Sequence, residues 1–202
     1  MENPFFNIED LDKEVSTEAS DEDKSGILAE KYLSIHEHRV EAIKHLTGRI
    51  PQEGEVFFLW TVNSFNAFTF IPFIIKECGV IQELVLSTYS INIRIIDALV
   101  KLIDRQMILK VDIFISDSIR SRLPKVYEHL ISLMEHKPVR VHYSWNHSKI
   151  ALIRTSDHYF DVEGSGNWGE NAQHEQYVFV NSRQVFEFRK KEILYGIDSG
   201  AI

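Results

Sequence analysis

The sequence predicts an α/β fold, with a mixed, largely parallel central sheet flanked by helices on both faces and preceded by an N-terminal helix. Short apolar runs alternate with longer stretches of helical periodicity between Val56 and Glu135, which implies crossover connections between neighbouring strands. Two extended runs separated by a short turn follow in residues 147–163 and predict a β-hairpin. The 202 residues are 44% hydrophobic, enough for one compact domain with its own core.

Two segments precede that domain. Residues 1–26 mix Asp, Glu, Ser and Thr with few apolar residues, a composition that buries too little surface to offset the entropy of ordering. We therefore expect an acidic, flexible N-terminal segment. In residues 27–50 apolar side chains recur at helical spacing, and the pattern stops at Gly48 and Pro51. This predicts one amphipathic helix, followed by the α/β domain in residues 51–202.

The elements of the α/β domain follow from local periodicity. Apolar and β-branched runs predict strands at residues 56–61, 83–87, 108–116, 139–143 and 175–180. Helical spacing predicts helices at residues 67–76, 93–105, 119–135 and 185–194. The hairpin joins residues 147–155 to residues 158–163 through a tight turn at Ser156 and Asp157. The sequence contains no internal repeat.

Charge and cysteine content limit the classes of function and the compartment. The formal net charge of −8 disfavours extensive nonspecific binding to nucleic acid unless basic side chains gather on one face. Much of the acid lies between Glu9 and Asp23. The single cysteine, Cys78, excludes an intrachain disulfide, and the N-terminus lacks the order of a secretory signal. A cytoplasmic location is therefore expected.

One run is long enough to be considered as a membrane span. Residues 56–75 carry no charged side chain, and a helix of that length would cross a bilayer. The run also contains Asn63, Ser64, Asn66 and Pro72, which favour a buried strand, a polar turn and the start of a helix. No stable membrane insertion is therefore expected.

Side chains that suit phosphoryl chemistry gather between residues 147 and 175. His147 and Lys149 are expected on one face of a strand, because side chains alternate between faces. In the turn Gly164–Asn167, glycines would let backbone N–H groups approach an anion, and Ser165 and Asn167 add side-chain donors. Donors beside a lysine stabilise the charge that spreads over phosphoryl oxygens during transfer. This part of the sequence therefore predicts a phosphoryl-binding site.

The same residues resemble a family signature. HSK at 147–149, followed by Asp157 and by GSGN at 164–167, is similar to the His-x-Lys, Asp, Gly-Ser-x-Asn pattern of the phospholipase D superfamily. The predicted alternation of strands and helices agrees with the fold of that family. The resemblance implies a catalytic set made of His147, Lys149, Ser165, Asn167, Glu175 and Asp157.

The resemblance also implies a role for each member. His147 would attack phosphorus to form a phosphohistidine, while Lys149, Ser165 and Asn167 would hold the non-bridging oxygens. Glu175 would hydrogen-bond the far imidazole nitrogen of the histidine and keep the attacking one free.

The acid of the signature is displaced. In the family pattern an acidic residue follows the lysine after four intervening residues, and Arg154 occupies that position here. Asp157 lies three residues further on, at the usual distance before Gly164. A longer hairpin accounts for both spacings, and the implied role of Asp157 is mostly structural.

Members of the superfamily that span one long chain carry the motif twice, whereas this chain carries it once. The resemblance implies a homodimer in which two His147 side chains face each other, one as nucleophile and one as general acid. It implies no cofactor and no metal, because His and Lys supply the charge stabilisation. The expected activity is that of a metal-independent phosphodiesterase, a hydrolase, and single-motif relatives resemble small bacterial nucleases.

Other interpretations stay open at this point. One is a noncatalytic module of the same fold that binds phosphate or nucleic acid as a scaffold. Another is a phospholipid phosphodiesterase, which would need an exposed apolar rim or a basic membrane-facing patch. A third is a structural protein in which the motif is a coincidence. Histidine pairs such as His36 with His38, or His142 with His147, lack the partners of a metal site.

Aromatic side chains near the motif allow two interpretations. Trp145 and Trp168 flank it, so each is expected either to stack on a base or sugar or to pack beneath the site. Phe65 and Asn66 follow the first strand and could border a substrate groove. Phe65 and the other aromatics of the region are otherwise expected in the core: Phe57, Phe58, Trp60, Phe65, Phe68, Phe70 and Phe73.

Overall fold

The computed structural model describes residues 40–61, 66–169 and 174–198. The chain divides into two units, residues 1–38 and residues 39–202, and the described residues belong to the second. Residues 40–47 are helical and fall within the helix expected at 27–50. The rest of that expectation up to residue 39, and the acidic segment 1–26, lie outside the described residues.

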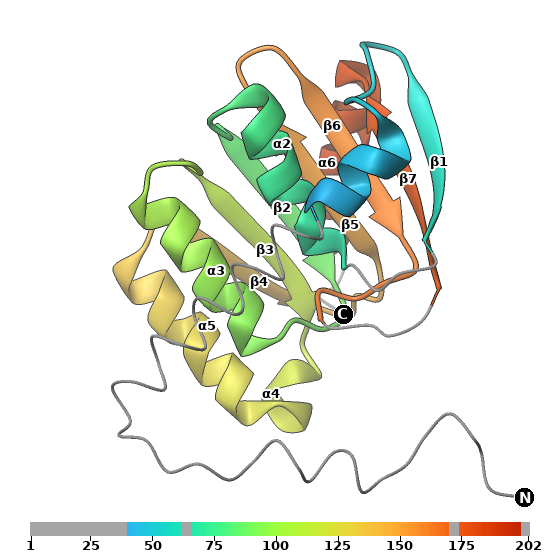
Figure 1. The fold of residues 1–202 in the computed structure, drawn as a ribbon. Helices are drawn as coiled ribbons and strands as arrows, with labels where there is room; N and C mark the ends of the chain where they lie inside the picture. The colour runs from blue at the N-terminus through green and yellow to red at the C-terminus, as the bar shows by residue number, and fades with distance from the viewer. Residues whose placement is uncertain (1–39, 62–65, 170–173, 199–202) are drawn as a thin grey trace, which may run out of the picture. The chain divides into compact units, whose positions relative to one another are not determined.

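In the described residues, seven strands form one mixed sheet in the order β1-β7-β6-β5-β2-β3-β4 (Figure 1). The strands are β1 Val56–Thr61, β2 Glu83–Thr88, β3 Val111–Ser116, β4 Val139–Ser144, β5 Lys149–Arg154, β6 Tyr159–Gly164 and β7 Glu175–Asn181. β2, β3 and β4 pair in parallel, and the other neighbours pair antiparallel. The expected mixed sheet is confirmed. Parallel pairing is less extensive than expected, because the chain after β4 returns through hairpins and β7 then pairs with β1.

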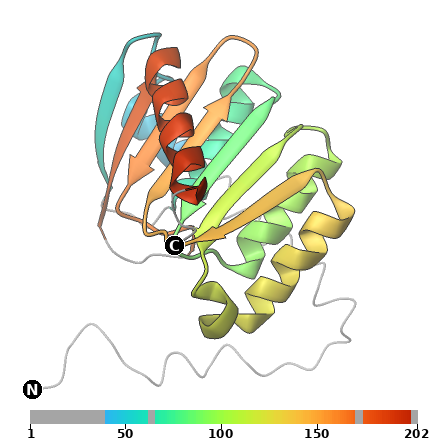
Figure 2. The same cartoon turned by 180° about the vertical axis from the view of Figure 1, so that it is seen from behind.

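Helices cover both faces of this sheet, as expected. They are η3 Ala67–Thr69, α2 Phe70–Cys78, α3 Ile93–Asp104, α4 Ile119–Arg122, α5 Pro124–His136 and α6 Arg183–Asp198. α2, α3 and α5 lie on one face, and α6 lies on the other (Figures 1 and 2). The helix expected at 119–135 is broken, because Leu123 precedes Pro124 and has φ −136° and ψ 66°. A residue before proline avoids the helical region, and proline suits the first turn of the next helix.

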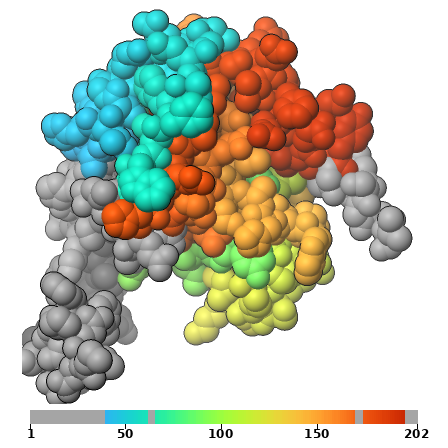
Figure 3. Space-filling model, turned by 90° about the vertical axis from the view of Figure 1, so that its right-hand side faces the viewer, coloured from blue at the N-terminus to red at the C-terminus, as the bar shows by residue number. Residues whose placement is uncertain are grey.

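Burial follows from these layers. β2 and β3 are buried at every position, because helices pack on both of their faces. β1 behaves differently, with Leu59 buried and Phe58 and Trp60 exposed by 78% and 62%. The expectation that Phe58 and Trp60 fill the core is therefore wrong: alternation turns them to the face that α6 leaves open. Figure 3 looks onto this side and shows the cyan side chains of β1 beside the orange strands.

The strand register brings several strand ends to one edge of the sheet. Thr61 pairs with Glu175, and Thr88 pairs with Lys149. β6, which is antiparallel to β5 and β7, ends at Gly164 beside them. We call this edge, with Thr61, Thr88, Lys149, Gly164 and Glu175, the Lys149 edge. The loops that carry the predicted site residues other than Asp157 begin or end here.

The uncharged run at residues 56–75 forms β1, η3 and part of α2, apart from residues 62–65, which lie outside the described part. Within the described ranges, no helix combines the length and the apolar character needed to cross a membrane. The expected strand and helix in this run are therefore observed.

A buried acid lies between the sheet and α6. Asp161 on β6 is 1% exposed, and Arg189 on α6 pairs with Glu163 at 2.5 Å but approaches Asp161 only to 4.0 Å. Burial, and after it the neighbouring Glu163, raise the pKa of Asp161 from 3.8 to about 8. The folded chain therefore holds a proton on Asp161 that the unfolded chain releases well below neutral pH.

This proton makes folding pH-dependent. Because the folded-state pKa is raised, stability contributed by protonated Asp161 is present below the unfolded pKa and is lost as pH rises toward 8. The free energy of unfolding is therefore expected to fall between pH 5 and 8, and Asp161→Asn should reduce this fall by at least about 1 kcal/mol. Urea unfolding at several pH values measures it. Glu187→Gln, on the exposed side of α6, is the control. Parallel curves for Asp161→Asn and the unmodified chain would show that Asp161 does not cause the dependence.

Candidate active site

The loop between β4 and β5 is held by one inward side chain. Asn146 Nδ2 donates to Ser87 Oγ at 2.9 Å and to the backbone oxygen of Phe114 at 3.1 Å. Its Oδ1 accepts from Ser148 N at 2.9 Å and from Ser148 Oγ at 2.8 Å. Asn146 thus ties the loop to β2 and β3 at the Lys149 edge. Its neighbours Trp145 and His147 are both exposed.

His147 and Lys149 are in direct contact. Lys149 Nζ lies 3.2 Å from His147 Nδ1 and donates to the backbone oxygen of His147 at 2.9 Å. His147 precedes β5 instead of lying on it, so the pair forms across the turn into the strand and not by strand alternation. The imidazole also contacts Tyr89, whose ring centroid is 4.7 Å from that of His147. Lysine and tyrosine therefore orient the histidine.

The electrostatics of the pair depend on Glu175. Burial lowers the pKa of Lys149 below its ordinary value, because the charged form loses solvation. Glu175, at the start of β7, opposes this and favours the ammonium. The side chain of Glu175 is buried, so its field reaches Lys149 with little screening by water. Lys149 and Glu175 are thereby linked across the Lys149 edge.

The glycine turn supplies the second group of polar side chains. Ser165 Oγ donates to the Glu175 carboxylate and accepts from the backbone N–H of Gln176 at 3.2 Å. Asn167 is half-buried, and its Oδ1 has no partner in the described structure. Ser165 and Asn167 therefore lie at the same sheet edge as His147 and Lys149, and the amide of Asn167 keeps an unused acceptor.

Gly164 has a packing role at this edge. A Cβ at this position would meet Tyr177 Cε1 at 2.6 Å and the backbone oxygen of Gln176 at 2.8 Å. The neighbouring strand β7 therefore requires glycine here, for close approach and not for a positive φ. The sequence interpretation assigned this glycine to anion contact, and the structure adds this second reason.

The hydrogen bond expected between Glu175 and His147 is not formed in this structure. Glu175 accepts from Ser165, and the imidazole Nδ1 faces Lys149. Glu175 therefore acts on Ser165 and Lys149 in this arrangement.

Asp157 lies apart from the other five predicted residues. It is in the turn between β5 and β6, where Ser156 Oγ donates to it at 2.6 Å. β5 begins at Lys149 and runs away from His147, so Asp157 is at the opposite edge of the sheet. Arg154, at the position of the signature acid, donates to Gln82 and lies 3.5 Å from Glu83. The structure therefore places Asp157 in the hairpin turn, and not in one catalytic set with the other five residues.

The two tryptophans that flank the motif differ in burial. Trp168 is fully buried and its ring contacts Phe68 edge-on, so it packs beneath the site. Trp145 is 93% exposed. Asn66 is buried, with both side-chain polar atoms lacking a partner in the described structure, and Phe65 lies outside the described residues.

Sequence reasoning missed three residues at this edge. Asn146 anchors the loop, Tyr89 contacts His147, and Arg122 on α4 places its guanidinium 4.2 Å from the centre of the Tyr89 ring. Asn146 and Tyr89 come from two separate loops, and Arg122 comes from the helix that follows β3. Only the polar triplet Asn146, His147 and Ser148, directly before a buried strand, offered a local signal.

The described residues contain no group of three metal-ligating side chains. His142 interacts with Asp112 at 3.4 Å and stacks on Phe114, and His36 and His38 lie outside the described residues. The proposed histidine pairs therefore gain no support as metal ligands.

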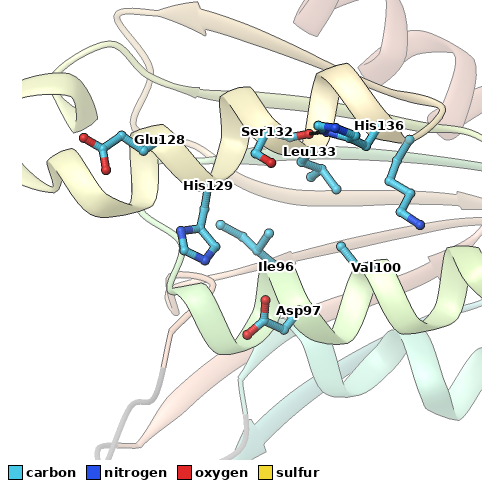
Figure 4. A pocket seen from close by; sticks show the side chains of 9 residues that line it. Ile96, Asp97, Val100, Glu128, His129, Ser132, Leu133 and His136 are labelled. Carbon is cyan, nitrogen blue, oxygen red and sulfur yellow. Dashed lines mark hydrogen bonds between the residues drawn. The ribbon is translucent and has the colours of Figure 1, made fainter.

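A groove of about 350 Å³ between α3 and α5 is separate from this site (Figure 4). Its walls include Asp97 from α3 and His129 and His136 from α5. Both imidazoles use Nδ1 on carbonyl oxygens of their own helix, at 3.2 Å and 2.8 Å. None of the predicted site residues lines this groove.

No protein-family model matches the chain, and no curated protein matches its sequence. Solved structures match it by fold. Nuc, a phospholipase D family member from Salmonella typhimurium, aligns over 72% of this chain and 95% of its own, with a TM-score of 0.54 and 15% identity. A polyphosphate kinase from Porphyromonas gingivalis aligns over 73% of this chain and 26% of its own, with a TM-score of 0.52 and 16% identity.

A phosphatidylserine synthase from Haemophilus influenzae is a further match, with a TM-score of 0.50 and 14% identity over 72% of this chain and 39% of its own. At such identities the likeness establishes the fold alone. The chain therefore has the phospholipase D-like fold that the motif implied. It spans nearly the whole length of Nuc but only about a quarter of the polyphosphate kinase.

The anchoring role of Asn146 makes a prediction. Asn146→Ala leaves the buried oxygen of Phe114 and the hydroxyl of Ser87 without this donor, so the free energy of unfolding is expected to fall by about 2 kcal/mol. Urea unfolding measures the change. Ser148→Ala removes the hydroxyl that donates to Asn146 Oδ1 and contacts Ser87 Oγ. It keeps both anchoring bonds of Asn146 Nδ2 and is expected to cost less than about 1 kcal/mol. Equal losses in the two variants would contradict the anchor.

Proposed function

We propose that this chain is a metal-independent phosphodiesterase that acts through a phosphohistidine at His147. The observation that carries the proposal is the direct contact of His147 with Lys149 at the edge that also holds Ser165, Asn167 and Glu175. A nucleophile, a cation and uncharged donors at one place suit phosphoryl transfer. The phospholipase D-like fold supports the proposal, because phosphoryl-group enzymes are named among the structures that share it.

The reaction would proceed in two displacements. A nitrogen of His147 forms a bond to phosphorus as the bond to the leaving oxygen breaks, and that oxygen takes a proton from a second histidine. Water then attacks the phosphohistidine, gives a proton to the second histidine, and releases His147. Lys149 and the amide of Asn167 would contact the non-bridging oxygens, and Ser165 would join them.

The arrangement of the pair indicates one rearrangement on the way. A lysine ammonium has donors and no acceptor, so its contact pairs it with an unprotonated Nδ1 of His147. The ring proton is then on Nε2. Lys149 would leave Nδ1 and bind a phosphoryl oxygen instead. The ring proton would then move from Nε2 to Nδ1, which frees Nε2 to attack phosphorus. Glu175 favours the charged lysine throughout.

The second histidine would come from a second copy of the chain, because one copy carries one motif. In that homodimer two His147 side chains face one phosphorus across a two-fold axis. Nucleic acid is the proposed substrate class, on the likeness to Nuc. A noncatalytic binding module of the same fold is the second candidate, favoured by the use of Arg154 on Glu83 where the signature has an acid.

Turnover of bis(p-nitrophenyl) phosphate in excess chelator tests the chemistry. His147→Ala is expected to lower turnover by at least about 10³-fold, because the attacking nitrogen is lost. His129→Ala, an exposed histidine on α5, is expected to retain full turnover. Phosphate binding without turnover in the native chain would favour the binding module. Turnover that persists in His147→Ala would reject the nucleophile.

Mixing native chains with His147→Ala chains tests whether two copies of the chain share one active site. If each site needs two histidines, adding His147→Ala chains in excess to native chains should suppress the activity per native chain several-fold as subunits exchange. Adding His129→Ala chains should leave it unchanged. Sedimentation of each mixture measures the oligomeric state in parallel. Activity that stays proportional to native chains in an exchanging dimer, or a fully active monomer, would contradict a shared site.

A further inference from the structure

Trp145 is exposed on a loop that is firmly held. Its side chain is 93% exposed, while Asn146 beside it makes hydrogen bonds to both β2 and β3. Looseness of the loop therefore does not explain the exposure. A large aromatic ring kept in water two residues from a candidate nucleophile is typical of a binding contact.

A second aromatic ring and a cation lie close to His147. The Tyr89 ring contacts the imidazole, and the guanidinium of Arg122 lies over Tyr89. Arg122 is therefore separated from His147 by a single aromatic ring. Within the described part of the chain Arg122 forms no ion pair, and its side chain donates a hydrogen bond to Ser118 Oγ at 3.3 Å. Its charge is free to meet an anion.

We propose that Trp145, Tyr89 and Arg122 form a subsite for single-stranded nucleic acid beside His147. A base would stack on Trp145, and Arg122 would bind a phosphate next to the one that His147 attacks. Alternating aromatic rings and cations are the means by which proteins hold single strands. The assignment of the attacked phosphate rests on the proposed function, whereas binding at the subsite does not.

The chemistry of the edge favours this ligand over a duplex or a lipid. Stacking on Trp145 needs an unstacked base, which a duplex does not offer. A lipid surface would need a wider apolar rim, but the neighbours of Trp145 are polar: Ser144, Asn146, His147 and Ser148. The net charge of −8 restricts a polyanion to a short stretch of local cations. A second copy of the chain covering Trp145 is the competing occupant, and the test separates it.

Binding of a fluorescein-labelled twelve-nucleotide oligothymidylate to the full chain, in excess chelator, measures the subsite through fluorescence anisotropy. Trp145→Ala is expected to raise the Kd about ten-fold, because one stacked base is lost. Trp145→Phe should recover part of the affinity. Arg122→Gln should reduce the slope of log Kd against log salt concentration by about 0.7, the contribution of one phosphate on a single strand.

Two variants serve as matched controls. Phe188→Ala removes a ring that is 55% exposed on α6, away from the Lys149 edge. Arg120→Gln removes a cation that lies over Tyr127 and Tyr143 instead of Tyr89. Both are expected to bind like the native chain. Sedimentation of every variant reports whether a change in binding accompanies a change in oligomeric state.

The outcomes separate this inference from the proposed function. Binding that depends on Trp145 and Arg122, with or without turnover, supports the subsite. Turnover of the chromogenic diester without binding of the oligonucleotide overturns the subsite and leaves the phosphodiesterase proposal intact. Native affinity in Trp145→Ala overturns the stacking. Dissociation of a dimer by Trp145→Ala overturns it as well, because the ring would then belong to a contact between two copies.

Discussion

One register holds the candidate site together: β5 runs antiparallel to both β2 and β6. It sets Lys149 opposite Thr88 and ends β6 at the same edge. The lysine and the glycine turn are therefore brought to one edge, although a whole hairpin separates them along the chain. A shift of one residue would turn Lys149 to the α6 face and Ala151 out of the core. The apolar side chains of β5, Ala151 and Ile153 on one face and Leu152 on the other, prevent that shift because all three are buried.

The same register separates the charges of the chain. Glu83 begins β2 at the opposite edge of the sheet, where Lys110 and Lys190 pair with it. Burial opposes its ionisation, but these cations hold its pKa at about 2, well below its ordinary value. Arg154 adds a third cation there. The buried carboxylate of Glu83 is therefore compensated by cations at the edge opposite His147, and it does not draw on Lys149.

Local sequence predicted most of the fold because strand and helix periods are properties of short segments. The strands at β1, β2, β4 and β7 were placed within a residue or two. The break before Pro124 was missed, since the apolar spacing continues across it while the backbone of Leu123 does not. The outward turn of Phe58 and Trp60 was also missed. Composition alone does not tell which face of an edge strand is covered, and α6 stops short of β1.

The candidate site was predictable only where its residues are close in sequence. His147, Lys149, Ser165 and Asn167 belong to two short segments, and the fold brings them to one edge. Tyr89 and Arg122 follow β2 and β3, so their contact with the site depends on the parallel order of those strands. The two tryptophans show the same limit most clearly. Trp168 is drawn inward because its backbone bridges to Ile91, whereas the inward bonds of Asn146 turn Trp145 outward, and neither cause is visible in the residues that flank the motif.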